Sequence, residues 1–358
     1  MHSLKVLFAL TAATALTACG GGGGDSPAPS PTPAPAPVPT PPPAPAPTPG
    51  VGTNGTLQTS VAAGTYTNAR LLNAFNQLNT VRQGAGAGLL AQSAALDASA
   101  SSHAKYLTDN NYNRPNSPHD ETSGLPDYTG ANPFTRMQGQ GYNYSFATEV
   151  IGDIGSSSPT SDCVGDLLDT VYHAASMLSR VTDVGFGYGT GSAAGMCTID
   201  MASPLSGGSS RQIPPSGAIV AYPYGGSTVA HGTFHVSSES PRVSTSLLPN
   251  NDAGVPIVVG FRNQDVVAGG VVSISQFTLA TAGGAAVPGV ILGATASGNV
   301  AAVGGNNVNA DANLDTDFAV FVPSSPLAAG TYTVTLHATI TGGRAISLTT
   351  WSFTVAAL

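Results

Sequence analysis

Apolar residues recur at helical spacing in the first half of the chain. Leu71, Phe75 and Leu78 are three or four residues apart, which places their side chains on one face of a helix. The pattern starts at Asn68, and the glycines of Gly84-Ala85-Gly86 predict where it ends.

Two further helices are predicted downstream. The second extends from about Ser93 to Asn110, with apolar residues along one face and two asparagines at its end. The third covers about Val164 to Leu178, with Leu167 and Val171 among its inward positions. Gly- and Pro-rich loops and short apolar runs surround these helices and favour a small sheet.

Beyond Pro215 the helical period disappears and alternation with period two replaces it. Tyr332, Val334 and Leu336 alternate with threonines, the signature of a half-buried strand. The strand-like runs in this half are Ala218–Ala221, Val255–Phe261, Val271–Leu279, Phe318–Val322, Tyr332–Ile340 and Ile346–Val355. So many short runs predict a β-sandwich, with Trp351 in its core.

These changes of pattern divide the chain, which is long enough for two domains. We expect a mixed helix and strand domain over residues 60–205 and an all-β domain over residues 212–358. Thirteen prolines lie between residues 26 and 49, alternating with small residues. Proline fixes φ and removes a hydrogen-bond donor, so we expect a stiff tether over residues 19–59.

The first residues have the features of a bacterial lipoprotein signal. Lys5 precedes an apolar stretch that is too short to span a bilayer, and Leu16-Thr17-Ala18-Cys19 fits a lipobox. We expect residues 1–18 to be a signal peptide and Cys19 to be acylated, which would anchor the chain to a membrane. An ordinary signal peptide with a coincidental cysteine is the weaker alternative, because five glycines and the tether follow Cys19.

No aspartate follows Cys19, and the resemblance to Gram-negative lipoproteins then implies the outer membrane or cell surface. Charged residues make up only 8% of the chain, and the formal net charge is −8. After the signal peptide the chain keeps one lysine, Lys105, and has no basic cluster. This composition excludes a nucleic-acid partner.

The two remaining cysteines are Cys163 and Cys197. In an oxidising envelope compartment an even pair predicts a disulfide, which would close a loop of more than thirty residues. Two buried thiols are the alternative, and the compartment disfavours it.

Three polar residues carry the candidate chemistry. His119, Glu149 and His173 lie within 55 residues, in polar or glycine-bearing surroundings. Two imidazoles and a carboxylate suit a divalent cation or a polarised water. Zinc or another divalent cation, bound by His119 and His173, is therefore the one cofactor that the sequence suggests. Asp169 precedes His173 by four residues, on the same face of the predicted third helix, where its carboxylate would orient the imidazole.

The order of these motifs resembles the CAP superfamily of cysteine-rich secretory, antigen 5 and pathogenesis-related 1 proteins, in its bacterial form. The resemblance covers about Asn68 to Pro204. The matching positions are the phrase Leu78-Asn79-Thr80-Val81-Arg82, then Ala100, His103, Ala104 and Tyr106, then His119, Tyr128-Thr129-Gly130, Arg136, Gly141-Tyr142, Glu149 and His173. The resemblance implies an α+β protein whose first domain is a three-layer α-β-α sandwich. Near the C-terminus, Pro326–Tyr332 and Thr350–Thr354 resemble bacterial immunoglobulin-like modules, which implies an immunoglobulin-like sandwich for the second domain.

The chain departs from the family pattern at two places. Ala174 replaces the arginine that follows the family histidine, and Asp166-Leu167-Leu168-Asp169 stands where many members carry a second glutamate. The fourth polar member of the cleft is therefore Asp169 or Glu121, or is absent. His103 matches a helical position of the family, where we expect it to pack.

The hypothesis that we favour is a lipid-anchored envelope protein whose CAP domain binds a small ligand or a divalent cation. Its cleft would contain His119, Glu121, Glu149, Asp169 and His173, and its ligand would be a lipid, a glycan or a cell-wall component. A metal-dependent hydrolase with Glu149 as general base is the rival, and a structural or adhesive surface protein is the third alternative. No serine lies in a Gly-x-Ser-x-Gly turn, so the sequence leaves catalysis open but favours binding.

Overall fold

The computed structural model describes residues 56–111, 117–155, 163–190, 194–205, 211–262, 272–294, 303–305, 307–340 and 344–357. The predicted signal peptide, the lipidation site Cys19 and most of the tether lie outside these residues. No helix in the described part of the chain is both long and apolar enough to cross a bilayer.

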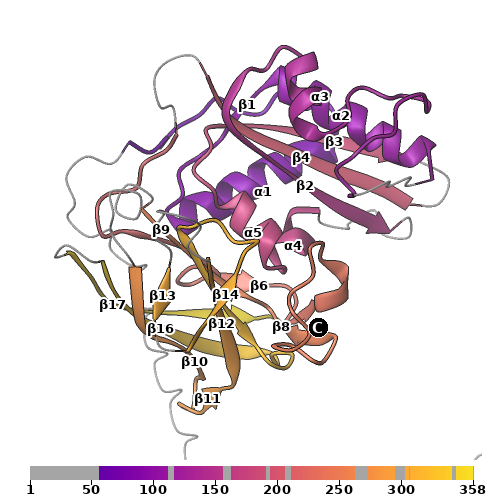
Figure 1. The fold of residues 1–358 in the computed structure, drawn as a ribbon. Helices are drawn as coiled ribbons and strands as arrows, with labels where there is room; N and C mark the ends of the chain where they lie inside the picture. The colour runs from indigo at the N-terminus through magenta and orange to yellow at the C-terminus, as the bar shows by residue number, and fades with distance from the viewer. Residues whose placement is uncertain are drawn as a thin grey trace, which may run out of the picture. The chain divides into compact units, whose positions relative to one another are not determined.

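The N-terminal part, up to residue 205, is a three-layer α-β-α arrangement around a four-stranded sheet (Figure 1). The strand order is β1-β3-β4-β2, with the bounds β1 Ala91–Gln92, β2 Tyr144–Gly155, β3 Asp183–Thr190 and β4 Ala194–Pro204. α2 (Ala94–Asp109) and α3 (Pro133–Gly139) cover one face, and α1 (Ala69–Ala85), α4 (Cys163–Leu168) and α5 (Tyr172–Met177) cover the other. The predicted α+β class is confirmed.

Two predicted helices form with the expected ends. Asn68 caps α1 by accepting a hydrogen bond from the backbone N–H of Arg70, and Gly86 ends it in the left-handed region at φ 81°. Ser93 caps α2, and Asn110 follows its last residue. The capping residues could therefore be identified from the sequence.

The Leu78–Arg82 phrase has a structural role. Both the side-chain amide and the carbonyl oxygen of Asn79 pair with the backbone of Leu90. The fully buried guanidinium of Arg82 donates to four backbone carbonyls, those of Ala87, Gly88, Met177 and Ser179. Burial lowers the pKa of Arg82 to about 9. These contacts connect α1 to the following loop and to the end of α5.

Three glycines let α2 approach the sheet closely. Gly185, Gly187 and Gly189 alternate along β3, and a Cβ atom at any of them would overlap α2 near Leu96, Ala100 or Ala104. The side chains on the opposite face of β3, including Phe186, enter the apolar core with α1. Because successive residues of a strand point to opposite faces, the glycine face of β3 packs on the backbone of α2. The other face packs on side chains of the apolar core.

The predicted third helix is wrong as a continuous element. It divides into α4 and α5, and residues 169–171 lie between them. The Thr170 hydroxyl donates to the Leu167 carbonyl, and the buried Glu239 carboxylate accepts the backbone N–H groups of Val171, Tyr172 and His173. A carboxylate that arrives from a segment more than sixty residues later therefore starts a second helix.

The C-terminal part contains two main sheets and a short hairpin. One sheet has the order β11-β10-β16-β17-β6, with β13 pairing with β10, and the other has the order β14-β12-β15-β9-β5. The bounds of the first are β6 Thr228–Val229, β10 Val272–Thr281, β11 Ala286–Val287, β13 Gly304–Gly305, β16 Gly330–Ile340 and β17 Arg344–Val355. The bounds of the second are β5 Ile219–Tyr222, β9 Ile257–Phe261, β12 Gly289–Ala294, β14 Val308–Asp311 and β15 Phe318–Pro323. The hairpin joins β7 (Thr233–His235) to β8 (Asp252–Gly254), with a 3₁₀ turn at Val236–Ser238.

The two sheets share an apolar core. Phe277 and Phe321 belong to different sheets, and their ring centroids are 5.8 Å apart. Trp351 is fully buried, and its Nε1 donates to the Pro223 carbonyl at 2.8 Å. All six predicted strand runs and the predicted position of Trp351 are confirmed. The immunoglobulin-like character of this part stays a prediction.

The predicted disulfide is confirmed, between Cys163 at the start of α4 and Cys197 on β4. The same apolar core continues from the helices of the N-terminal part into both sheets of the C-terminal part. A buried ion pair also joins the two parts, with Arg180 Nε 3.0 Å from Asp317 Oδ2. The disulfide closes 34 residues of chain, so it restricts the unfolded state most in the region around α4 and α5.

Candidate functional site

Six ionisable residues gather between α2, α3 and the sheet, and we call them the charge cluster. They come from five separate places in the N-terminal part. His103 lies on α2, His119 and Glu121 on the loop after it, Arg136 on α3, Glu149 on β2 and Asp200 on β4. All except His119 are buried.

Glu149 lies at the centre of this cluster. Arg136 Nη2 donates to both of its oxygens, at 2.9 and 2.8 Å, and His119 Nδ1 lies 2.8 Å from Oε1. Burial by itself would raise the pKa of Glu149. The positive charge of His103, the hydrogen bond from His119 and the charge of Arg136 outweigh burial and lower the pKa to about 2. The carboxylate is therefore ionised at neutral pH.

His119 connects this buried network to solvent. Its side chain is 26% exposed, whereas the Glu149 side chain has no exposure. An ionised carboxylate can only accept, so Nδ1 of His119 carries the hydrogen of their bond. In the neutral imidazole Nε2 is then the acceptor nitrogen, and it has no partner among the described residues. The site therefore presents one oriented basic nitrogen at its surface.

His103 and Glu121 support this arrangement from the interior. His103 Nδ1 lies 2.9 Å from Glu121 Oε1, and Nε2 lies 3.1 Å from the Pro118 carbonyl. Glu121 also accepts the backbone N–H groups of Thr129 and Gly130. Arg136 Nη1 donates to the His119 carbonyl at 2.9 Å. These bonds fix the loop that carries His119, so His103 does more than pack.

Asp200 adds a second carboxyl group beside Glu149. The two residues are direct partners in the antiparallel pairing of β2 and β4. Burial raises the pKa of Asp200 well above its usual range, and the neighbouring Glu149 charge raises it further. The raised pKa favours the neutral form of Asp200, next to an ionised Glu149.

This difference between the two carboxyl groups predicts opposite responses to amide substitution. Asp200→Asn should leave the free energy of unfolding at pH 7 unchanged or raise it, because asparagine resembles the neutral acid. Glu149→Gln should lower it by about 3 kcal/mol, because Arg136 would remain buried without its counter-charge. Urea denaturation of both variants is the measurement.

The pH dependence of the stability of Asp200→Asn tests the raised pKa of Asp200. The folded-state pKa of Asp200 is raised, so its contribution to stability is fully present only below about pH 4 and is lost as pH rises. Any advantage of Asp200→Asn should therefore shrink as the pH falls from 7 towards 4. An Asp200→Asn variant as unstable as Glu149→Gln at pH 7 would contradict a protonated Asp200.

The structure does not bring Asp169 and His173 to the charge cluster. His173 Nδ1 lies 3.0 Å from Thr170 Oγ1 and 3.4 Å from Glu239 Oε1. Asp169 Oδ2 lies 3.2 Å from His231 Nδ1, on a segment of the C-terminal part. The expected pairing of Asp169 with His173 required one continuous helix. The break between α4 and α5 removes it.

The sequence interpretation missed three members of the cluster: Arg136, His103 in this role, and Asp200. A signal for Arg136 was present, because a carboxylate among apolar neighbours needs a buried cation and the chain has few. Asp200 could be found only from the strand register, which pairs it with Glu149.

A metal ion in a protein needs several donor side chains that converge on one point. Within the described ranges no three His, Cys, Asp or Glu side chains are grouped so that they could hold a metal ion. Arg136 engages both oxygens of Glu149, and His173 lies elsewhere. His119 is the member of the charge cluster that reaches the surface. A cation at this site would therefore have one nitrogen ligand from the cluster, His119 Nε2.

Comparisons with known proteins agree with the layered fold. Residues 75–201 match the family model described as CAP, the cysteine-rich secretory protein family. No curated protein sequence matches the chain.

Three solved structures show limited similarity. An extracellular protein containing an SCP domain from Bacillus anthracis str. Ames is 22% identical with a TM-score of 0.31, and the match covers 38% of this chain and 41% of that one. CopC from Methylosinus trichosporium OB3b is 13% identical with a TM-score of 0.20, over 38% of this chain and 87% of that one. PcoC from Escherichia coli, a methionine-rich copper resistance protein, is 17% identical with a TM-score of 0.21, over 38% of this chain and 93% of that one.

At these TM-scores the three structures carry no argument about this chain. The family match, the α-β-α layers and the positions of His119 and Glu149 agree with one another. The segment from Phe75 to Met201 is therefore a CAP domain of the cysteine-rich secretory protein family.

Proposed function

We propose that this protein is a lipid-anchored protein of the bacterial cell envelope whose CAP domain binds a small, hydroxyl-bearing ligand at His119. The observation that carries the proposal is the exposed His119 imidazole, oriented by an ionised and buried Glu149. A neutral imidazole held in this way accepts a hydrogen bond from an O–H or N–H group.

Two exposed aromatic rings, one on the loop that contacts Glu121 and one on α3, favour a ligand with apolar faces as well as hydroxyl groups. In the described part of the chain, Tyr128 and Phe134 are two of the three exposed large apolar side chains, at 38% and 42%. Tyr128 is the residue before Thr129, whose backbone N–H donates to Glu121, and Phe134 lies on α3 with Arg136. Exposed rings and one hydrogen-bond acceptor suit a saccharide. For a protein anchored in the envelope, this means a cell-wall glycan.

The charge cluster favours binding over hydrolysis. In the hydrolase alternative Glu149 would act as general base, which requires an oxygen that can accept a proton from water. Both oxygens of Glu149 already accept hydrogen bonds from Arg136. A pKa of about 2 also makes this carboxylate a weak base. His119 remains as the reactive group at the surface.

A binding titration tests the proposal. Soluble peptidoglycan fragments are added to the isotope-labelled protein, and the imidazole resonances are followed by NMR. We expect the His119 signals to shift, and His119→Ala to weaken binding by about tenfold or more. His337→Ala, at an exposed position on β16, is the control and should bind like the wild type. Unchanged affinity of His119→Ala would refute the proposal, and binding of zinc alone through His119 would identify the ligand as a cation.

The proposed anchor gives a separate prediction. Cys19→Ala should move the protein from the membrane fraction to the soluble fraction, because acyl chains on this thiol would be its one attachment to the membrane. The variant should keep the circular dichroism spectrum and the thermal denaturation of the wild type. Cell fractionation with a high-salt wash is the measurement. Persistence of the variant in the washed membranes would contradict lipid anchoring.

A further inference from the structure

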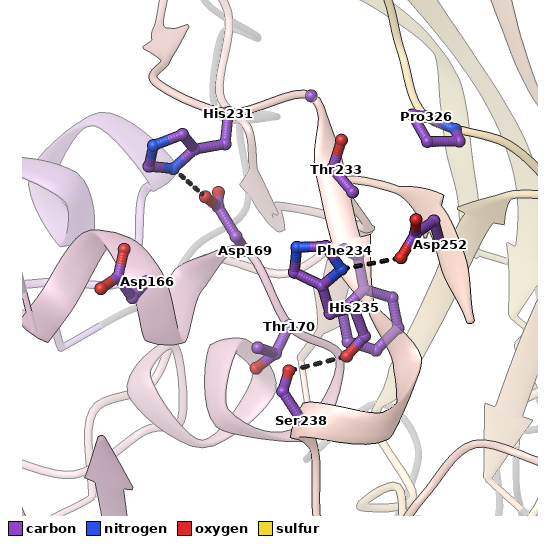
Figure 2. Close-up of a pocket in the computed structure, with 11 residues that line it drawn as sticks. Asp166, Asp169, Thr170, His231, Thr233, Phe234, His235, Ser238, Asp252 and Pro326 are labelled. Carbon is purple, nitrogen blue, oxygen red and sulfur yellow. Dashed lines mark hydrogen bonds and ion pairs between the residues drawn. The ribbon is translucent and has the colours of Figure 1, made fainter. Parts of the chain in front are cut away.

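A second site lies away from the charge cluster, in a cavity of about 550 Å³ (Figure 2). One wall comes from the CAP domain, at the end of α4 and the link to α5. The other wall comes from the C-terminal part, mainly from the β7–β8 hairpin and the residues just before it. Its volume is in the range of small-molecule sites. None of the members of the charge cluster lines it.

Acidic side chains predominate among the charged groups that line this cavity. Asp166, Asp169 and Asp252 contribute carboxyl groups, and His231 and His235 contribute imidazoles. None of the described residues that line the cavity is a lysine or an arginine. Threonine and serine hydroxyls and the ring of Phe234 complete the wall. With neutral imidazoles the lining carries a negative charge, which attracts cations.

Two of these three carboxyl groups pair with histidines. His231 Nδ1 lies 3.2 Å from Asp169 Oδ2, and His235 Nδ1 lies 2.7 Å from Asp252 Oδ1. Figure 2 shows these two pairs as separate contacts along the cavity. Asp169 is nearly buried, at 8% exposure, whereas the His235 and Asp252 side chains are 62% and 56% exposed. The cavity thus has one nearly buried carboxyl group, Asp169, beside the half-exposed His231, and one exposed acidic pair at its opening.

The spacing of these groups decides which kind of cation fits. A metal ion needs three or more ligands that converge at about 2.0–2.6 Å. Among the described residues no three His, Cys, Asp or Glu side chains are grouped in that way. An alkylammonium group needs carboxylate and hydroxyl acceptors only at ordinary hydrogen-bond distance, and its carbon chain can occupy the remaining volume.

We propose that this cavity binds a small organic amine cation. Asp169 holds the ammonium group in the interior, and Asp252 attracts the ligand at the opening. Because Asp169 belongs to the CAP domain and Asp252 to β8, the bound ligand contacts both parts of the molecule. Binding therefore also stabilises the contact between them.

Calorimetric titration of the full-length protein with 1,4-diaminobutane at low salt tests this proposal. We expect saturable binding that weakens as salt is added, and no binding of the uncharged 1,4-butanediol. Asp169→Asn and Asp252→Asn should each reduce the affinity by about tenfold. Asp109→Asn removes an exposed carboxylate on α2 and should leave the affinity unchanged.

Several results would overturn the proposal. One is the absence of saturable binding by the wild type, and another is equal affinity in the Asp169→Asn/Asp252→Asn double variant. Zinc chloride binding that depends on Asp169, without any binding of the amine, would replace the organic cation with a metal ion. If Asp169→Asn fails to fold, Asp252→Asn decides the matter, because its side chain is exposed. The result does not depend on the His119 site, since none of the substituted residues belongs to the charge cluster.

Discussion

Replacing Arg136 with methionine should lower the free energy of unfolding by about 3–5 kcal/mol at pH 7. The substitution leaves Glu149 buried and ionised without its guanidinium partner. It also removes the hydrogen bond to the His119 carbonyl, which fixes the loop of the candidate site. Methionine fills a similar volume, so the loss measures mainly the missing charge and hydrogen bonds. Chemical denaturation of the variant and the wild type is the measurement.

The loss should depend on pH in a defined direction. The folded-state pKa of Glu149 is lowered to about 2, so the stability that it contributes is present above the unfolded value of about 4.5 and is lost as pH falls towards 2. Without Arg136 that lowering is weaker, and protonation of Glu149 becomes easier. The deficit of Arg136→Met should therefore be largest at neutral pH and should shrink between pH 4.5 and 3.

Arg242→Met is the matched control, because Arg242 is exposed on a loop of the C-terminal part. It should change stability by less than about 0.5 kcal/mol. A similarly small loss for Arg136→Met would mean that the guanidinium does not balance the buried Glu149 charge. His119 would then lack the fixed orientation on which the proposed ligand binding depends.

Local sequence signals were sufficient for the helices and strands that end at local features. Asn68 and Gly86 bound α1 through contacts within a few residues of each end. The alternation of Tyr332, Val334 and Leu336 corresponds to side chains that are all buried in the sheet. In each case the determining interaction lies within one element or on one of its faces.

Local signals failed where a distant residue determines the outcome. Periodicity predicted one helix from Val164 to Leu178, but Glu239 caps a new helix at Tyr172 from more than sixty residues away. The same error placed Asp169 beside His173. Asp169 instead faces His231 and lines the second cavity, a contact that no spacing within the CAP segment could predict.

In the candidate site, too, some residues could be identified from local signals and others could not. His119 and Glu149 were identified from their residue types and from the order of the family motifs, and the structure places them 2.8 Å apart. Arg136 was recognised only as a position in that motif order. Its role depends on α3 packing over β2, which brings the guanidinium to Glu149. A buried ion pair is a property of the assembled layers and not of either segment.

The largest predicted effect on the contact between the two parts concerns Arg180 and Asp317. Their side chains are 6% and 5% exposed, so each charge has lost most of its hydration. Burial raises the pKa of Asp317 even though Arg180 opposes this, which indicates that desolvation exceeds the attraction between the two. Asp317→Leu should lower the free energy of unfolding by about 3–5 kcal/mol, because Arg180 would stay buried without its acid and close to the charge of Arg211.

The double variant Arg180→Met/Asp317→Leu should lie within about 1 kcal/mol of the wild type, because no unpaired charge remains in the interface. A double-mutant cycle from chemical denaturation measures the coupling. The cycle also tests whether the two parts unfold together. Their apolar core is continuous, so all four proteins should show a single transition. Additive losses in the double variant would show that the two side chains are not coupled, and the loss in Asp317→Leu could not then be assigned to an unpaired Arg180. Two separate transitions would show that the CAP domain folds independently of the sheets.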